Sequence, residues 1–194
     1  MSPGFSAADT VIAFSAAREL MRLFAYTVPA LALIWYLVLE KKSLNLSGPP
    51  APRKNDFYTL AIGFPGLILI GAGISVLTAN LTPFIMPPEI GRPGNPGGWI
   101  LLVFSCAGTG YLEESFFRFY LLQKLRNWIA SAPVRVIFSV FLFALCHGYE
   151  GPWGILNAVL AGLLLSTLFE KYKSLHGIAF AHAFYNIFVY VTGM

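Results

Sequence analysis

Two adjacent glutamates and an arginine stand in the stretch TGYLEESFFRFYLLQKL, residues 109–125, between long apolar runs. At the depth of a membrane, each such charge costs roughly 3 kcal/mol even on the mildest scale, so intramembrane charges are functional candidates by default. A carboxylate in a low-dielectric site beside a histidine can act as a general base that activates water. The first question is which glutamate is free for that chemistry.

Helix geometry predicts different roles for the two glutamates. Glu114 and Arg118 are four residues apart with the acid first, which favours an ion pair on one helix face. Glu113 points about 100° away from its neighbour, and so remains an unpaired carboxylate aimed elsewhere. A snorkelling cluster at the helix end is the structural alternative. It is disfavoured because Glu113 lies about 21 Å along the helix from Trp99, at 1.5 Å per residue.

Further polar residues interrupt two later apolar runs. His147 ends the run FLFALCHG, and Phe143 precedes it by one helical turn; His182 and Asn186 lie one turn apart in HGIAFAHAFYN. A lone membrane histidine is usually a packing residue held by a hydrogen bond. Two histidines, an asparagine and a free glutamate on three helices are instead expected to converge on one polar pocket.

Three other residues are expected to stay outside this site. We assign His176 to a solvated loop, KSLHG. Cys106 and Cys146 are expected to be small buried hydrophobic residues, since free cysteine is among the most buried residue types.

The composition is that of a membrane protein. Of the 194 residues, 57% are hydrophobic and 11% are charged, against about 25% charged in a soluble domain. Apolar runs of roughly twenty residues, enough for a bilayer core of about 30 Å, recur along the chain. They predict an all-α, polytopic helical bundle in the cell (plasma or inner) membrane, with the lipid bilayer as its partner. The net charge of +4 is modest and indicates membrane topology, with no nucleic acid bound.

The sequence predicts six spans in a single membrane domain, residues 1–194. Residues 1–98 would hold two accessory spans and their loops, and residues 99–194 a four-helix catalytic core. The stretches GPPAPRKND and PFIMPPEIGRPGNPGG are predicted loops. Residues 1–24 lack the pattern of a cleavable signal and are expected to be retained. The expected spans are 21–39, 57–81, 99–112 with a helical continuation to 128, 133–147, 153–169 and 175–191.

Basic residues alternate between the expected loops. The loops after spans one, three and five hold most of them: Lys41, Lys42, Arg53, Lys54, Lys124, Arg126, Arg135, Lys171 and Lys173. The other side holds Arg92, with Arg18 and Arg22 preceding span one. By the positive-inside bias, this pattern predicts cytoplasmic basic loops and both termini outside.

The polar motifs resemble those of the CPBP family, the intramembrane CAAX-type proteases and bacteriocin-processing enzymes. That family is characterised by EExxxR, then FxxxH, then HxxxN or HxxxD. The corresponding stretches here are EESFFR, FALCH and HAFYN, in the same order over about 75 residues. They contain Glu113, Glu114, Arg118, Phe143, His147, His182 and Asn186.

The resemblance implies a helical bundle around a polar cavity and an intramembrane endopeptidase acting on a membrane-associated protein or peptide. Glu113 and His147 would activate water, and His182 and Asn186 would stabilise the oxyanion. Glu114 and Arg118 would support them, with Phe143 in the same role. CAAX-like tails and C-terminal sorting signals are the substrate types that it suggests.

Two alternatives remain open at this point. Glu113, His147 and His182 are a ligand set for catalytic zinc of the thermolysin class. The resemblance favours a glutamate-dependent site without a cofactor, and the helical HExxH spacing is absent. The second alternative is a non-enzymatic transporter or binding protein that uses the same polar cluster as a path.

Overall fold

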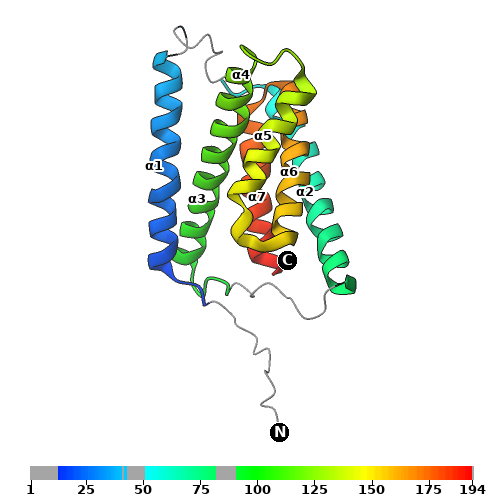
Figure 1. Ribbon diagram of the computed structural model, residues 1–194. Helices are drawn as coiled ribbons and strands as arrows, with labels where there is room; N and C mark the ends of the chain where they lie inside the picture. Colours follow the sequence, from blue (N-terminus) through cyan, green and yellow to red (C-terminus); the bar gives the residue numbers. More distant parts are fainter. Residues whose placement is uncertain (1–12, 41, 43–50, 82–90, 194) are drawn as a thin grey trace.

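The structure is a computed structural model that describes residues 13–40, 42, 51–81 and 91–193. Throughout these ranges the chain is helical and free of strands, and the helices run side by side in one bundle (Figure 1). Residues 1–12, which were expected to be retained, Lys41 and parts of the two predicted loops, residues 48–50 and 83–90, lie outside the described residues. The elements are α1 (Ala16–Glu40), α2 (Lys54–Leu81), α3 (Pro96–Glu113), η1 (Glu114–Leu121), α4 (Leu122–Leu125), α5 (Ala132–Cys146), η2 (Gly148–Glu150), α6 (Gly151–Tyr172) and α7 (Leu175–Thr192).

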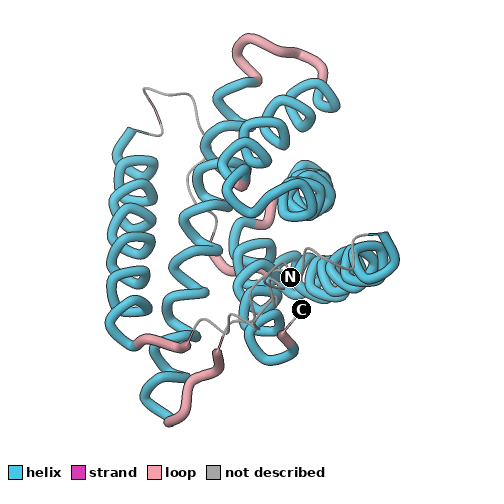
Figure 2. Tube along the Cα trace, turned by 60° about the horizontal axis from the view of Figure 1, so that its bottom comes forward, coloured by secondary structure: helices cyan, strands magenta, loops and turns pink. Residues whose placement is uncertain are grey.

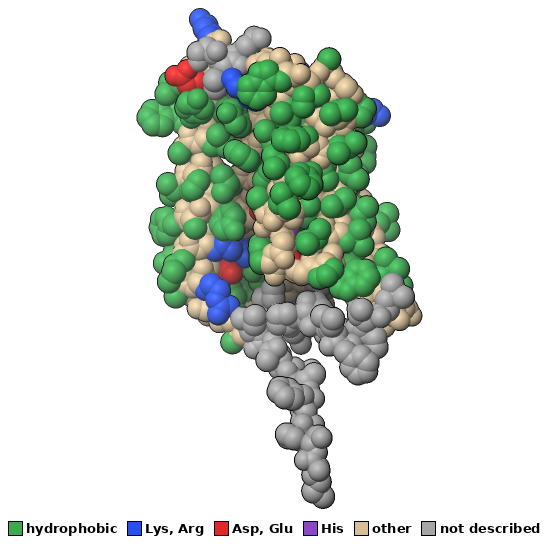
Figure 3. Space-filling view, viewed as in Figure 1, with side chains coloured by type: hydrophobic (Ala, Val, Ile, Leu, Met, Phe, Trp, Pro, Cys, Tyr) green, Lys and Arg blue, Asp and Glu red, His purple; other side chains and the backbone are tan. Residues whose placement is uncertain are grey.

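The predicted fold class, a helical membrane bundle, is confirmed. All six predicted helical segments are present, with α3, η1 and α4 forming one continuous rod. Three segments are long and apolar enough to cross a membrane, namely Ala16–Glu40, Lys54–Asn80 and Gly148–Tyr172, and α5 is a shorter apolar helix. The outward faces are largely hydrophobic (Figure 3), with residues such as Met21 and Leu69 about 70% exposed. Such a surface suits lipid as the solvent.

Several helices begin earlier than the sequence predicted. α2 begins at Lys54, inside the predicted loop GPPAPRKND. α1 begins at Ala16, so Arg18 and Arg22 lie within its first two turns and do not precede it. α3 begins at Pro96, inside the segment predicted to be irregular. Asn95 caps it by accepting a hydrogen bond from Gly98 N at 2.8 Å. An N-cap asparagine followed by proline at the first position outweighs the local glycine and proline content.

The sequence predicted a plain helix for the rod that carries the two glutamates. In the structure, this rod widens into a π-helix over η1. Such wide turns leave α-type hydrogen bonds unmade, and side chains take up the freed carbonyl oxygens. Ser139 of α5 donates to Phe117 O at 3.0 Å, and Gln123 donates to Phe119 O at 2.6 Å. The π segment is therefore supported by the helix beside it.

The basic loops gather at one end of the bundle, where the connections after α4 and α6 meet the start of α2. Arg53 donates to Lys173 O at 2.8 Å. Glu170, in the last turn of α6, pairs with Arg126 at 3.1 Å, with Arg135 at 3.8 Å and with Lys173. The tilted view of Figure 2 shows the connections lying at the two ends of the helices. This arrangement agrees with alternating spans, and the cytoplasmic side of the basic end stays a prediction.

Helices α3 and α7 approach each other closely just before the first glutamate of the pair. A methyl group at Gly110 would lie 2.8 Å from Ala179 O and 3.2 Å from Ala183 N. Only glycine allows the two backbones this distance, as is common where membrane helices pack. The contact is one turn from Glu113 on α3 and from His182 on α7, so it sets the spacing of these side chains.

We predict that Gly110→Ala forces α3 and α7 apart, destabilising the bundle by about 1–3 kcal/mol. Thermal unfolding of the purified protein in detergent measures this as a lower Tm. Gly73→Ala is the matched control, because a methyl group at Gly73 meets no atom within 4 Å. Equal Tm values for the two variants would contradict the role of this close contact.

Candidate active site

The site is assembled where three helical segments meet. Glu113 ends α3, Glu114 and Arg118 lie on η1, and His182 lies on α7. The structure brings these four side chains together, with Phe143 and His147 of α5 beside them. All three sequence motifs thus meet in one place.

The ion pair predicted between Glu114 and Arg118 is present and fully buried. Arg118 Nη1 donates to Glu114 Oε1 at 3.1 Å, and both side chains have zero exposure. Arg118 Nε also donates to Ser166 Oγ of α6 at 3.3 Å. The pair therefore links η1 to α6 within the apolar interior.

The Phe143 ring lies at the centre of the cluster. The guanidinium carbon of Arg118 lies 4.2 Å from its centroid, which is a close cation–π contact. The His147 ring is 4.4 Å away and the His182 ring 6.4 Å away, measured between centroids. Phe143 thus separates the buried arginine from His147 while contacting both.

Gly162 on α6 leaves the space that Arg118 and Phe143 occupy. A methyl group there would lie 3.3 Å from Arg118 Nη2 and 3.3 Å from Phe143 Cδ1. The sequence analysis did not identify Ser166 as a partner of the arginine. The signal was the position of Ser166, one helical turn after Gly162 on the same face.

His182 lies between the two glutamates. Its Nδ1 is 2.9 Å from Glu114 Oε1, and its Nε2 is 3.7 Å from Glu113 Oε2. Glu114 Oε1 also accepts a hydrogen bond from Arg118, and a carboxylate oxygen is an acceptor, so Nδ1–H of His182 is the donor in this contact. This hydrogen bond fixes the ring and directs Nε2 toward Glu113.

Glu113 is the less engaged of the two glutamates. Its side chain is 17% exposed, and Oε2 is buried without a hydrogen-bond partner in the part of the chain that the structure describes. Buried polar atoms are normally satisfied, so an unpartnered carboxylate oxygen needs an explanation. A site that takes up a water or a substrate group provides one.

His147 lies at the C-terminal end of α5 and is half-buried. Its Nδ1 is 2.8 Å from Phe143 O, an acceptor only, so Nδ1 carries the proton. In the neutral ring Nε2 then has the free lone pair that a base requires. Tyr149, which the sequence analysis missed, stacks on His147 with the ring centroids 6.4 Å apart.

Asn186 lies one turn after His182 on α7 and is half-buried. Its amide makes no hydrogen bond with the described residues, so both of its N–H donors are available.

Two expectations outside the site were wrong. His176 belongs to α7, where it is hydrogen-bonded with Tyr111 at 2.9 Å, and Cys146 is exposed. Cys106 is buried as expected.

We compared the placement of Glu113, His147 and His182 with the needs of a metal ion. Among residues 13–40, 51–81 and 91–193, no three histidine, cysteine or acidic side chains are grouped closely enough to hold one. As placed, the three side chains do not fit a zinc site.

A family comparison agrees with the motifs. Residues 95–188 match the model of the family described as Type II CAAX prenyl endopeptidase Rce1-like. This range contains every candidate site residue, and the match confirms the resemblance to CAAX-type proteases over this segment. Neither the curated proteins nor the solved structures give a match.

We predict that Arg118→Leu strongly destabilises the protein, by about 3–5 kcal/mol, because the buried Glu114 would lose its arginine partner in the interior. Unfolding in detergent, followed by circular dichroism, measures the change. Arg126→Leu is the control, since its guanidinium is 42% exposed and forms a surface ion pair worth about 1 kcal/mol or less. A loss for Arg118→Leu no larger than the control's would contradict a structural role for the buried pair.

Proposed function

We propose that this chain is a CAAX-type intramembrane endopeptidase that hydrolyses a peptide bond of a membrane-associated protein or peptide. The observation that carries the proposal is the unpartnered carboxylate oxygen of Glu113 among the family's motif residues. The neighbouring Glu114 is neutralised by Arg118, which leaves Glu113 free to act on water. We further propose that the protein resides in the cell (plasma or inner) membrane.

Glu113 and His147 together are suited to activate the attacking water. Glu113 accepts one proton of the water, and the free Nε2 of His147 is available for the second hydrogen bond. The two groups lie within electrostatic range of each other. General-base catalysis of this type contributes about 10²–10⁴-fold to the rate.

His182 and Asn186 are suited to hold the oxyanion that forms on the peptide carbonyl. When both of its ring nitrogens carry a proton, His182 has a charge of +1. The buried group of His182, Arg118, Glu113 and Glu114 then has a net charge of zero. Its Nε2–H is then a donor toward the reacting carbonyl, and the Asn186 amide is a second donor on the same helix face. One such donor is worth about 3 kcal/mol in a transition state.

The proposed reaction proceeds without a cofactor. The hydrogen bond from His182 to Glu114 and the one from His147 to Phe143 O each orient a ring nitrogen, and the cluster offers no three-ligand metal site within the described chain. We therefore derive no step through zinc.

Metal analysis tests this point directly. We predict less than one tenth of an equivalent of zinc in the purified active protein, and unchanged cleavage after dialysis against a chelator, since a bound catalytic zinc would be near one equivalent. Stoichiometric zinc that is lost together with activity would contradict the metal-free mechanism.

The central experiment compares the termini of membrane proteins in cells that express wild type or Glu113→Gln at equal levels. The substitution keeps the size of the side chain and removes the base, so we predict a loss of cleavage of at least about 10²-fold with the fold retained. New termini that are present only with the wild type would also identify the substrate, whether a CAAX-like tail or a sorting signal.

Glu40→Gln is the matched control, because Glu40 ends α1 away from the cluster and its loss should leave the termini unchanged. Indistinguishable terminal profiles for wild type and Glu113→Gln would refute the protease. Altered solute transport in Glu113→Gln and His147→Ala would then favour the transporter.

A further inference from the structure

A cluster of basic side chains lies at the end of the bundle where α4, α6 and the start of α2 meet. Its centre is the carboxylate of Glu170, in the last turn of α6. Three cations converge on this one group: Arg126 at 3.1 Å, Arg135 at 3.8 Å, and Lys173. These four residues, which we call the Glu170 cluster, therefore have a net charge of +2.

Two of the three cations are open to the surroundings. The side chains of Arg126 and Lys173 are 42% and 41% exposed, whereas that of Arg135 is 7% exposed. Arg126 and Lys173 both donate to the same carboxylate oxygen, Glu170 Oε2, so their charged ends lie close together. A guanidinium has five N–H donors and an ammonium group has three, so each keeps donors for a second anion.

Arg135 builds the turn beside these exposed cations. Its Nη1 donates to Ile129 O at 2.8 Å and to Ala130 O at 2.7 Å, between α4 and α5. The turn held in this way presents Trp128, which is 76% exposed and lies two residues after Arg126. Tryptophan is enriched where lipid meets water, because its ring is apolar and its N–H is polar. The cluster thus combines exposed cations with an exposed indole.

The backbone of Lys173 supports a role for its side chain. Lys173 follows α6 with a φ of 50°, and it is the one non-glycine residue with a positive φ in the part of the chain that the structure describes. Helices commonly place glycine at such a position, since a side chain is unfavourable there. A lysine at a strained position indicates a use for its ammonium group.

The level of the cluster in the bundle indicates which kind of anion it meets. Two of the segments long enough to cross a membrane, Lys54–Asn80 and Gly148–Tyr172, have one end here, at the top of Figure 1. Arg53 joins these ends by donating to Lys173 O at 2.8 Å. The end of a spanning segment lies at the depth of the lipid headgroups. Basic sites between helices at this depth suit acidic headgroups.

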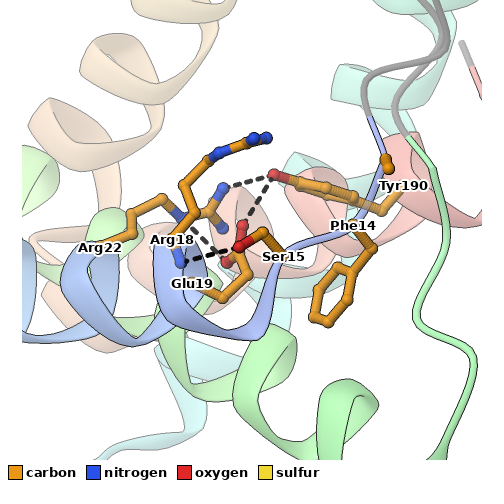
Figure 4. A pocket seen from close by; sticks show the side chains of 7 residues that line it. Phe14, Ser15, Arg18, Glu19, Arg22 and Tyr190 are labelled. Carbon is orange, nitrogen blue, oxygen red and sulfur yellow. Dashed lines mark hydrogen bonds and ion pairs between the residues drawn. The ribbon is translucent and has the colours of Figure 1, made fainter.

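At the opposite end of the bundle, a partly buried arginine is balanced within the protein. Arg22 pairs with Glu19 at 3.4 Å and donates to Tyr190 Oη at 2.5 Å, as Figure 4 shows. One cation there faces one carboxylate, whereas three cations share Glu170. The neighbouring Arg18 is exposed and lies on the first turn of α1, far from the Glu170 cluster, so it offers a matched control.

We propose that the Glu170 cluster binds the phosphate of an anionic phospholipid, with Arg126 and Lys173 as its direct partners. A phosphodiester with one negative charge lowers the excess charge from +2 to +1, and a guanidinium can bind it through two parallel N–H bonds. The acyl chains lie against the apolar outer faces of the helices, with Trp128 at the headgroup level. Because α4 continues the rod that carries Glu114, the bound lipid joins that rod to α6. This inference is independent of the proposed protease activity.

The test measures lipid binding by the purified protein in a neutral detergent. Native mass spectrometry with added phosphatidylglycerol or phosphatidylcholine gives the Kd of each bound lipid. We expect one phosphatidylglycerol to bind about tenfold more tightly than phosphatidylcholine, the usual value of a charge-assisted hydrogen bond. Arg126→Gln and Lys173→Gln should each remove most of this preference, and Arg126→Lys should retain part of it. Arg18→Gln is the control at the opposite end and should keep the full preference.

Lys173→Gly separates binding from folding. It removes the ammonium group and also relieves the positive φ, so the Tm of the lipid-free protein should stay within about 4 °C of the wild type. Its binding of phosphatidylglycerol should be weakened as much as that of Lys173→Gln. In the wild type, added phosphatidylglycerol should raise the Tm, because it binds the folded state, and this gain should be absent in Lys173→Gly.

Three outcomes would overturn the site. The first is equal binding of the two lipids by the wild type, and the second is an unchanged preference in the double variant Arg126→Gln/Lys173→Gln. The third is an equal loss in Arg18→Gln, because binding would then follow the net charge of the protein.

A soluble phosphate is the competing source of the anion. Inorganic phosphate and glycerophosphoglycerol carry the same group without acyl chains, and we expect neither to displace the lipid at concentrations near the Kd of the lipid. Displacement by either at such concentrations would overturn the assignment to a lipid and identify a soluble ligand.

Discussion

The buried ion pair between Glu114 and Arg118 is the interaction on which the rest of the site depends. Neither charge has any solvent exposure, so neither can remain in the bundle without the other. Arg118 Nη1 donates to Glu114, and Glu113 Oε2 has no hydrogen-bond partner among the described residues. It also orients His182, whose Nδ1–H donates to the same carboxylate oxygen that accepts from Arg118. The Glu114–Arg118 pair thereby leaves Glu113 available and orients His182 toward it.

The apolar surroundings make this pair specific as well as costly. Phe143 covers the guanidinium at 4.2 Å, and Gly162 leaves room for both side chains. The π-helical turn of η1 presents Glu114 and Arg118 to the interior, and Ser139 satisfies one of the carbonyl oxygens within it. Each of these features would be unfavourable alone. Together they hold a charged cluster in a bundle whose outer surface is lipid-like, since the helices around it supply partners to Arg118 Nε, Glu114 Oε1 and His182 Nδ1.

Much of this arrangement was predictable from the sequence, because it depends on helical periodicity. Spacing four residues apart identified the Glu114–Arg118 pair, and long apolar runs identified six helical segments. Spacing does not report on contacts between helices. Ser166, Tyr149 and the contacts of Arg22 were therefore missed. Ser166 lies on α6 and Tyr149 on η2, and Arg22 of α1 reaches Ser105 of the parallel helix α3. The start of α3 was predicted too late in the sequence. The Asn95 side chain caps the helix and stabilises its first turn, although the surrounding residues are rich in glycine and proline. The roles proposed for the site residues stay predictions.

A second cluster, at the start of α1, also pairs a buried carboxylate with an arginine. Glu19 lies 3.4 Å from Arg22 Nε and accepts from Ser105 of α3, as Glu114 lies 3.1 Å from Arg118 Nη1. The two pairs differ in exposure, because the Arg22 side chain is 25% exposed and that of Arg118 is fully buried. An arginine without access to solvent depends on its carboxylate more strongly than one that water can reach. The Glu114–Arg118 pair therefore constrains the interior of the bundle, whereas the Arg22 pair joins α1 to α3 and α7 near the surface through Ser105 and Tyr190.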